Sequence, residues 1–462
     1  MNEENEMKIL DTLSGNEKEL KSSGKIRIYL CGVTVYDESH IGHARTIIVF
    51  DILRRYLESS GIEVELVQNF TDVDDKIINR AKRENVRSST ISSRYIQEYN
   101  NEFDALNVKR ATKYPKATEH IQDMLNLVQG LVDKKIAYVS KNGVYFSVAK
   151  FPDYGKLSKK KIDDLISGAR VEVDQAKNDP LDFALWKFSD SDPSWESPWG
   201  RGRPGWHIEC STMSLKYLGE NFEIHGGGRD LIFPHHENEI AQSESYSNKP
   251  FAKIWMHVGM ITINGEKMSK SLGNIKSIKS LLKSWGPNVL RIFCIAGHYS
   301  KPIDYSEELL KEHETNWNKA RLAYHKLIQT EKDGQPIEDI DSTLSQIKSE
   351  FLKAINKNLN THMALSAFYR LVTVCLANEE HLTKSLSEKI ISIFEEMMNI
   401  LGLRIEKVSD EEKAHIQSLI KQREEFRQQK KYEEADGIRD KLAAKGIELK
   451  DEIHQTIWMK KE

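Results

Sequence analysis

Hydrophobic and polar positions near the start of the chain fall into short blocks that predict strands and helices in alternation. An apolar run over residues 25–31 ends at Cys31 and predicts a buried strand, and a helical spacing of apolar residues follows from about 42 to 59. A second apolar run at 62–70 predicts another strand, and Thr71–Asp74 has the capping-box pattern that opens a helix. This β-α-β-α order at short spacing predicts an α/β fold with a parallel, doubly wound, Rossmann-like sheet.

The pattern changes along the rest of the chain and divides it into further units. Short strand-like pieces interrupt the sheet domain, which resumes in a segment rich in glycine and histidine. An Asn264-Gly265 dipeptide between alternating residues predicts a hairpin, and helical spacing then dominates up to a small last unit with two helices and a short strand. The predicted units are a sheet domain split between 1–117 and 201–250, a connective insertion at 118–200, a hairpin-and-loop region at 251–304, a helical bundle at 305–400 and a C-terminal α/β unit at 401–462.

Composition narrows the classes of protein that this chain can represent. Its 462 residues and net charge of −3 exclude a small, globally basic nucleic-acid-binding protein, so any RNA-binding surface must be a local patch. The four cysteines are too few for a disulfide framework and favour a reducing compartment. The acidic N-terminus lacks the apolar core of a signal peptide, and no apolar run approaches the roughly 20 residues of a membrane helix. We therefore expect a cytoplasmic protein with no membrane partner.

The segment Cys31–His43 joins the first predicted strand to the first predicted helix and carries candidate chemistry. Helix N-termini present unpaired N–H groups and positive partial charge, which suits them to bind phosphates. His40 and His43 are three residues apart, so a helical turn would bring both rings to one face at that end. The residues alone leave two interpretations open: a phosphate site, or a pair of surface histidines that cap the helix.

A second candidate site combines residues that are distant in the sequence. Cys31, Cys210, His235 and Glu239 offer thiol, imidazole and carboxylate groups, the ligand types that zinc takes, and the last two are spaced to share a helical face. The spacing is not that of a compact zinc finger, so Cys31 and Cys210 could also be inert thiols in the core. We expect Cys294 and Cys375, which lie in apolar runs, to be inert core thiols. Ile240 stands where an HExxH motif would need histidine, which excludes a metalloprotease helix.

Lysines at two places in the sequence could bind anionic groups. Lys267 and Lys270 lie in a loop that Gly273 closes, where they are either solvated or placed to clamp the phosphates of a nucleotide. The run Lys159–Lys161 is interpreted as a solvated face, with contact to a polyanion as the alternative. Neither loop decides a function by its charge alone.

Two short motifs give the chain a family resemblance. The tetrad His40–His43 reads HIGH and the loop Lys267–Ser271 reads KMSKS, and in this order they resemble the class I aminoacyl-tRNA synthetases. The strings CGVTVYD, NFTDVDDKII, PGWHIECS, HGGGRDLIFPHHENEIAQ and EKMSKSLGN together resemble the cysteinyl-tRNA synthetase family, over nearly the whole chain. The resemblance implies an enzyme that activates L-cysteine with ATP and transfers it to the 3′ end of tRNA(Cys).

The resemblance also implies roles for individual residues. It implies one zinc ion per chain that recognises the substrate thiol, with Mg²⁺ accompanying ATP. Zinc would separate cysteine from serine because sulfur is a good zinc ligand and a neutral hydroxyl a poor one. Thr71, which the residues alone favour as a helix cap, would contact substrate. The implied residues are Cys31, Cys210, His235 and Glu239 for zinc; His40, Gly42, His43, Gly227, Asp230 and Lys270 for ATP; His40, His43, Lys267 and Lys270 for catalysis; and Cys31, Thr71, Trp206 and His225 for the cysteine substrate.

The same resemblance assigns 251–304 to a KMSKS loop and stem-contact region and 401–462 to an anticodon-binding unit. One departure lies in His454–Trp458, which lacks the glycine that the family often has before its late tryptophan. We expect a monomer, since no dimerisation segment is evident. Two rivals stay open: a ligase on the same catalytic domain that passes cysteine to the amine of an amino sugar, as in mycothiol synthesis, and a non-catalytic paralogue that only binds RNA or a partner.

Overall fold

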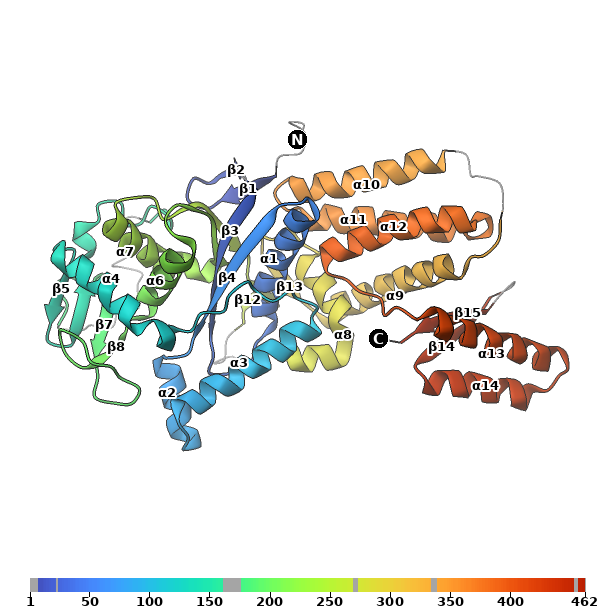
Figure 1. The fold of residues 1–462 in the computed structure, drawn as a ribbon, viewed down its shortest axis with the longest axis horizontal. Coiled ribbons are helices and arrows are strands. Elements are labelled where there is room, and N and C mark those ends of the chain that lie inside the picture. Colours follow the sequence, from blue (N-terminus) through green and yellow to red (C-terminus); the bar gives the residue numbers. More distant parts are fainter. Residues whose placement is uncertain are drawn as a thin grey trace.

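The centre of the molecule is a four-stranded parallel sheet (Figure 1). The computed structural model describes residues 7–21, 24–160, 176–268, 273–333, 339–452 and 456–461. The strand order is β10-β9-β3-β4, so strands far apart in the sequence are hydrogen-bonded neighbours, which confirms the predicted parallel α/β sheet. The strands are β3 (Lys25–Thr34), β4 (Glu63–Thr71), β9 (Phe222–Gly228) and β10 (Ala252–Val258).

Strand β3 is buried on both faces, and its alternating side chains enter two different cores. Ile28 and Leu30 pack into the cluster that contains the apolar face of α1 (Ile41–Ser59). Tyr29 and Cys31 point the other way, into a cluster shared with α6 (Trp206–Leu218) and α7 (Glu237–Ser247). Because successive side chains of a strand point to opposite faces, the position of Cys31 in this alternation sends its sulfur to the α6 and α7 face.

The C-terminal end of β3 pairs irregularly with β4. The pairing shifts register between Leu30 and Val33, and the Gly32 N–H donates to Asn69 Oδ1 at 2.9 Å. A Cβ on Gly32 would lie 1.6 Å from the Asn69 carbonyl oxygen, so the strands can approach here only because residue 32 is glycine. A bulge of this kind re-aims the side chain beside it, which here is Cys31.

A separate four-stranded antiparallel sheet lies between the two parts of the central sheet in the sequence and at the left of Figure 1. It packs against α4 (Ile121–Asp133), and its own apolar cluster includes Phe146 and Trp186. Lys160 lies over the ring of Phe233 at 5.6 Å, while Lys161 lies outside the described residues. The strands are β5 (Ala137–Ser140), β6 (Gly143–Phe146), β7 (Phe183–Phe188) and β8 (Gly202–Pro204).

Helices make up most of the C-terminal third, and they extend to the right in Figure 1. The last small unit, which begins at α13 (Asp410–Gln428), has its own core around Trp458. It lies beside α9 (Glu307–Gln329), and the Gln329 side chain of α9 donates a hydrogen bond to the Trp458 carbonyl. The predicted helical spacing is confirmed, and a second strand completes the terminal hairpin. The other elements are α8 (Ile278–Ile295), α10 (Ile340–Asn356), α11 (Thr361–Ala377), α12 (Lys384–Leu401), α14 (Tyr432–Ala444), β14 (Ile447–Asp451) and β15 (Thr456–Lys460).

One local prediction is wrong, one hairpin was not predicted, and one predicted turn is confirmed. Thr71 does not cap a helix: it ends β4, and Asp74 is the N-cap of α2 (Asp75–Glu84). An N-terminal hairpin of β1 (Lys8–Asp11) and β2 (Asn16–Glu19), too short and polar for a clear alternation, went unpredicted. The Asn264-Gly265 turn is confirmed, because both residues have positive φ between β11 (Ile261–Ile263) and β12 (Glu266–Lys267). The remaining elements are α3 (Ser88–Ala105) and β13 (Ile303–Tyr305).

No helix in the part of the chain that the structure describes combines the length and apolar character needed to span a bilayer.

An ion-pair cluster joins three strands of the central sheet. Glu223 of β9 accepts from Arg27 Nε of β3 at 2.9 Å and from Lys253 Nζ of β10 at 2.9 Å. Burial acts to raise the pKa of Glu223, but the hydrogen bonds from Arg27 and Lys253 outweigh it and hold that pKa at about 2. The carboxylate therefore stabilises the fold in its ionised form.

Replacing Glu223 with glutamine is expected to destabilise the protein at neutral pH but not in strong acid. Because the folded pKa of Glu223 lies below its unfolded value near 4.5, its contribution is complete above that value and disappears as the pH falls toward 2. We expect Glu223→Gln to lower the free energy of unfolding by roughly 2 kcal/mol at pH 7, after allowance for partial solvent screening. Urea titrations of both proteins between pH 7 and pH 2.5 measure the difference. A difference independent of pH would contradict this account.

Candidate functional site

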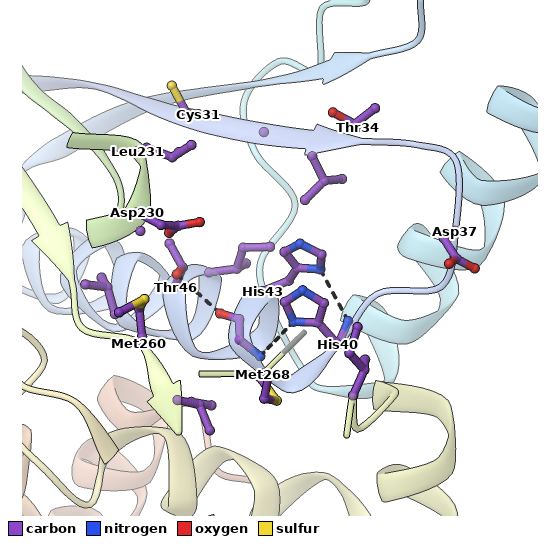
Figure 2. A pocket seen from close by; sticks show the side chains of 18 of the residues that line it. Cys31, Thr34, Asp37, His40, His43, Thr46, Asp230, Leu231, Met260 and Met268 are labelled. Carbon is purple, nitrogen blue, oxygen red and sulfur yellow. Dashed lines mark hydrogen bonds between the residues drawn. The ribbon is translucent and has the colours of Figure 1, made fainter. Parts of the chain in front are cut away.

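A pocket of about 420 Å³ opens at the carboxyl end of the central sheet, between β3 and the start of α1 (Figure 2). Ligands of open parallel sheets bind at this edge, outside the carboxyl ends of the strands. The loop after β3 forms one wall, the segment after β9 forms a second, and the hairpin that leads to the KMSKS loop forms a third. The lining includes Cys31, His40, Gly42, His43, Trp206, Asp230 and Lys267.

The two histidines of the HIGH tetrad cap α1 and also line the pocket. The Gly42 N–H donates to His40 Nδ1 at 3.1 Å, and the His40 N–H donates to His43 Nδ1 at 3.3 Å, which makes a reciprocal capping box. The two rings stack with centroids 3.7 Å apart and lie between β3 and α1. The N-terminus of this 19-residue helix therefore faces the pocket with its N–H groups and positive partial charge.

Next to the pocket, four side chains from separate elements bring metal-ligating atoms together. Cys31 comes from β3, Cys210 from α6, His235 from the turn before α7 and Glu239 from α7. One ligand atom from each lies within 4.8 Å of the others. Cys31 Sγ is 3.4 Å from Glu239 Oε1, and His235 Nε2 is 3.1 Å from the same oxygen. Cys31 also lines the pocket, so this group adjoins the space in front of α1.

The electrostatics of this group favour a bound cation. All four side chains are buried, and burial lowers the pKa of His235 well below its usual range, so its imidazole is neutral. Burial raises the pKa of Cys31 well above its usual range, so its thiol is also neutral when no metal is bound. Among the described residues, Glu239 has only histidines as ion-pair partners. A buried carboxylate without a lysine or arginine is costly, and a metal cation would compensate its charge.

A second group of potential ligands overlaps the first. His225 Nε2 and His236 Nε2 lie 3.5 Å and 3.2 Å from Cys31 Sγ, and one ligand atom from each of His225, His236, Cys31 and Glu239 lies within 4.8 Å of the others. His236 Nδ1 is 2.7 Å from His257 Nε2, so its second ring nitrogen is already committed to a neighbouring histidine. The two groups share Cys31 and Glu239, and they differ in whether Cys210 and His235 or His225 and His236 complete the set.

Sequence reasoning missed both His236 and His257. The only signal for His236 is the His-His pair in HHENE, in which both members turn out to face the metal-ligating group. For His257 there is no local signal, since it lies within an ordinary buried strand. Its Nδ1 is 2.8 Å from the hydroxyl of Thr12, in the N-terminal hairpin. Contacts of this kind depend on tertiary packing and leave no spacing in the sequence.

The structure distributes the remaining predicted residues between the pocket and its surroundings. Trp206 is 39 % exposed and lies against His235, with ring centroids 4.2 Å apart, at the junction of pocket and metal-ligating group. Thr71 is buried and its hydroxyl donates to Glu209 Oε2 at 2.8 Å. His225 is fully buried beside Cys31 and does not line the pocket.

The phosphate-side candidates divide in the same way. Asp230 and Lys267 are exposed side chains that line the pocket. Gly227 lies behind the pocket, where a Cβ would meet the His236 ring at 3.0 Å. Lys270 lies outside the described residues.

Comparison with known proteins gives matches over nearly the whole chain. Residues 17–315 match the family model of the class I (C) tRNA synthetase catalytic domain, and residues 409–458 match that of the cysteinyl-tRNA ligase anticodon binding domain. The chain is 46 % identical to the cysteine–tRNA ligase of Thermodesulfovibrio yellowstonii, over 98 % of this chain and 99 % of that protein. It is 45 % identical to the cysteine–tRNA ligase of Caldicellulosiruptor saccharolyticus, over 96 % and 98 %.

Solved structures agree at the level of the fold. Mycobacterium tuberculosis methionyl-tRNA synthetase in complex with methionyl-adenylate matches with a TM-score of 0.61 at 15 % identity, covering 82 % of this chain and 89 % of that one. The leucyl-tRNA synthetase of Agrobacterium radiobacter K84, in a ternary complex, matches with the same TM-score at 9 % identity, covering 83 % and 85 %. The shared architecture is that of class I synthetases.

Substitutions at His40 separate its capping role from a role toward phosphate. His40→Ala removes the acceptor of the Gly42 N–H and is expected to cost about 1 kcal/mol of stability, whereas His40→Asn supplies a good N-cap and should keep it. Thermal unfolding measures both. If His40 also contacts phosphate, ATP binding weakens in both variants. ATP binding that weakens only in His40→Ala would assign the residue to capping alone.

Proposed function

Because this chain belongs to the cysteinyl-tRNA synthetase family of class I aminoacyl-tRNA synthetases, we propose that it activates L-cysteine with ATP and then transfers the cysteine to tRNA(Cys) at one composite pocket. The observation that supports this proposal most strongly is that Cys31 takes part in two sites. This residue belongs to the metal-ligating group and also lines the pocket that the HIGH helix faces. A substrate thiol held beside Cys31 would have its carboxylate directed toward a nucleotide in front of α1.

In the first step, the cysteine carboxylate attacks the α-phosphate of ATP, giving cysteinyl-adenylate and releasing pyrophosphate. The reaction needs no side-chain nucleophile, so positioning and stabilisation of charge provide the catalysis. His40, Gly42, His43 and the N–H groups of α1 bind one side of the triphosphate. Asp230 contacts the nucleotide from the segment after β9, and Gly227 lets that segment pack closely against His236 behind it. Lys267 and Lys270 of the KMSKS motif neutralise the departing pyrophosphate. Mg²⁺ accompanies ATP, and we assign no side chains to it.

We propose one zinc ion per chain, held by Cys31, Cys210, His235 and Glu239. Zinc would supply a Lewis-acid position that favours a thiolate over a hydroxyl. Trp206 and Thr71 shape the space for the substrate, and His225 stands behind Cys31. A site that demands one specific polar partner gives the correct substrate a kcat/KM roughly 10⁴–10⁵ times that of its competitor. Such a ratio is enough to reject serine without an editing domain. The insertion at 118–200 is small for such a domain.

The C-terminal part supplies the contacts for tRNA. We propose that the unit at 401–462 binds the anticodon and that 251–304 contacts the acceptor stem beside the KMSKS loop. The family match over residues 409–458 supports the first assignment. A tRNA bound in this way would reach from the terminal unit to the pocket along α8 and the bundle. All proposed groups come from one chain, so we propose a functional monomer.

The two rival functions predict different products. A ligase that passes cysteine to an amino sugar would not need the helical bundle and the terminal unit, and a non-catalytic RNA-binding protein would need neither of the two phosphate motifs. The test is cysteine-dependent ATP–pyrophosphate exchange, followed by transfer of labelled cysteine to tRNA(Cys). We expect both activities. Exchange without transfer to tRNA would favour the amino-sugar ligase, and loss of both would favour the binding protein.

Replacing Cys210 with serine is expected to separate the thiol site from the nucleotide site. Serine is a poor zinc ligand, so purified Cys210→Ser should lose its zinc, and its KM for cysteine should rise roughly 100-fold while its KM for ATP changes by less than about threefold. Metal analysis and exchange kinetics measure these quantities.

Cys375→Ser is the matched control, since Cys375 is equally buried but lies in α11, away from the metal-ligating group. It should keep its zinc and both KM values. Equal losses of cysteine and ATP binding in Cys210→Ser, together with unfolding, would assign a purely structural role to the metal.

A further inference from the structure

The carboxyl end of α12 is held by side chains that belong to the catalytic half of the chain. Arg291 of α8 donates from Nε and Nη2 to the Leu401 carbonyl at 3.1 Å and 2.9 Å. Arg55 of α1 donates to the Asn399 carbonyl at 3.3 Å, and the Asn107 side chain donates to the Gly402 carbonyl at 2.8 Å. The last carbonyls of a helix have no partner within the helix, so these donors satisfy the end of α12 from outside.

A buried carboxylate ties the two arginines together. Asp51 Oδ2 accepts from Arg55 Nε at 2.8 Å and from Arg291 Nη2 at 2.7 Å, and Asp51 Oδ1 accepts from the Lys109 N–H at 2.9 Å. The side chains of Asp51 and Arg291 are 1 % and 0 % exposed. Two cations and one anion leave a net positive charge at the negative end of the α12 dipole, which is the favourable sign there. We call Asp51, Arg55 and Arg291 the α12 anchor.

Gly402 makes room for this anchor. It follows α12 with a φ of +67°, the left-handed conformation in which many helices end. A Cβ at this position would lie 1.9 Å from Arg291 Nη2. Beyond it, Asn288 of α8 and the backbone of Arg404 exchange two hydrogen bonds, at 2.9 Å and 3.0 Å. The chain is thus fixed to α8 just before it leaves for the C-terminal unit.

The anchor acts on the same helix that presents the HIGH histidines. Asp51 lies 11 residues after His40, so a rigid α1 places it about 16 Å along the axis from the capped end. The start of α1 faces the pocket, and its later turns contact α12. A shift of the bundle relative to α1 would therefore move the C-terminal unit relative to the pocket.

We propose that the α12 anchor is a positioning cluster for the tRNA step. It sets the angle between the catalytic half and the tRNA-binding half, so that a tRNA bound by the C-terminal unit presents its 3′ end to the pocket. The proposal rests on the proposed function, since it concerns the transfer of cysteine to tRNA. It assigns no role to the anchor in adenylate formation, because none of its three residues lines the pocket.

The test uses Arg291→Lys in the full-length protein. Lysine keeps the charge but cannot donate from a planar fork to Leu401, Leu106 and Asp51 together. We expect cysteine-dependent ATP–pyrophosphate exchange to stay within about twofold of the unchanged protein, while kcat/KM for tRNA falls about tenfold, in the range of a typical coupling between sites. The KM values for cysteine and ATP should not change.

Arg45→Lys is the matched control for loss of a buried guanidinium on α1. Arg45 is fully buried and donates to the carbonyls of Gly259 and Met260, at 2.8 Å and 3.0 Å, in the pocket wall. It makes no contact with the α12 end, so Arg45→Lys should lower exchange and charging in parallel. The same parallel fall in Arg291→Lys would overturn the proposal, as would unchanged charging.

Asn107→Gly keeps the test decisive if Arg291→Lys does not fold. Asn107 has a φ of +56°, which glycine tolerates, and the change removes the donor to Gly402 while leaving the buried charges in place. We expect faster amide hydrogen exchange at the end of α12 and a selective fall in tRNA charging. Faster exchange of these amides with unchanged charging would overturn the proposal. Absence of pyrophosphate exchange in the unchanged protein would instead contradict the proposed function. The α12 anchor would then have a role in stability only.

Discussion

The alternation of side chains along β3 is the constraint on which the rest of the site depends. Ile28 and Leu30 pack against α1, so Tyr29 and Cys31 must face α6 and α7. The irregularity between Leu30 and Val33 then interrupts the pairing with β4 at Cys31 and Gly32. One strand therefore positions the helix that faces the pocket on one side and a thiol on the other, at the same edge of the sheet.

Burial gives this thiol its chemical setting. When no metal is bound, Cys31, Cys210 and His235 are neutral groups around Glu239, whose ion-pair partners among the described residues include no lysine or arginine. The pocket side of Cys31 is open to solvent: the N-terminus of α1 and Lys267 place positive groups there, beside the carboxylates of Asp37, Glu38 and Asp230. The two environments meet at Cys31 and suit the two ends of one substrate, a soft sulfur and a carboxylate that must reach a phosphate.

Much of the fold could be predicted from the sequence because its signals are local. The apolar runs, the spacing of α1 and the Asn264-Gly265 turn each carry a period or a turn preference of their own, and the structure confirms them. Thr71 was misassigned because a Thr-x-x-Asp pattern fits both a cap and a strand end, and its tertiary contact with Glu209 decides the outcome. The hairpin at the N-terminus was missed because short polar strands have no clear alternation.

The candidate site shows the same division. His235 and Glu239 could be paired from their spacing, but nothing in the sequence alone places Cys31 next to Cys210, which lies 179 residues later; family resemblance supplied that link. His257, Asp51 and Arg291 were not predicted at all, because each is an ordinary residue of a buried strand or helix until the tertiary fold brings its partner to it. Long-range polar contacts leave no period by which they could be recognised.

The most direct test of the account is the sulfur content of the metal's coordination sphere. Zinc-edge X-ray absorption on the purified protein, without and with L-cysteine, counts the sulfur ligands. We expect two sulfur ligands in the free protein, from Cys31 and Cys210. L-cysteine should add a third sulfur, and L-serine should leave the number at two. A sphere that stays at two sulfurs with saturating L-cysteine would contradict recognition of the substrate through its thiol.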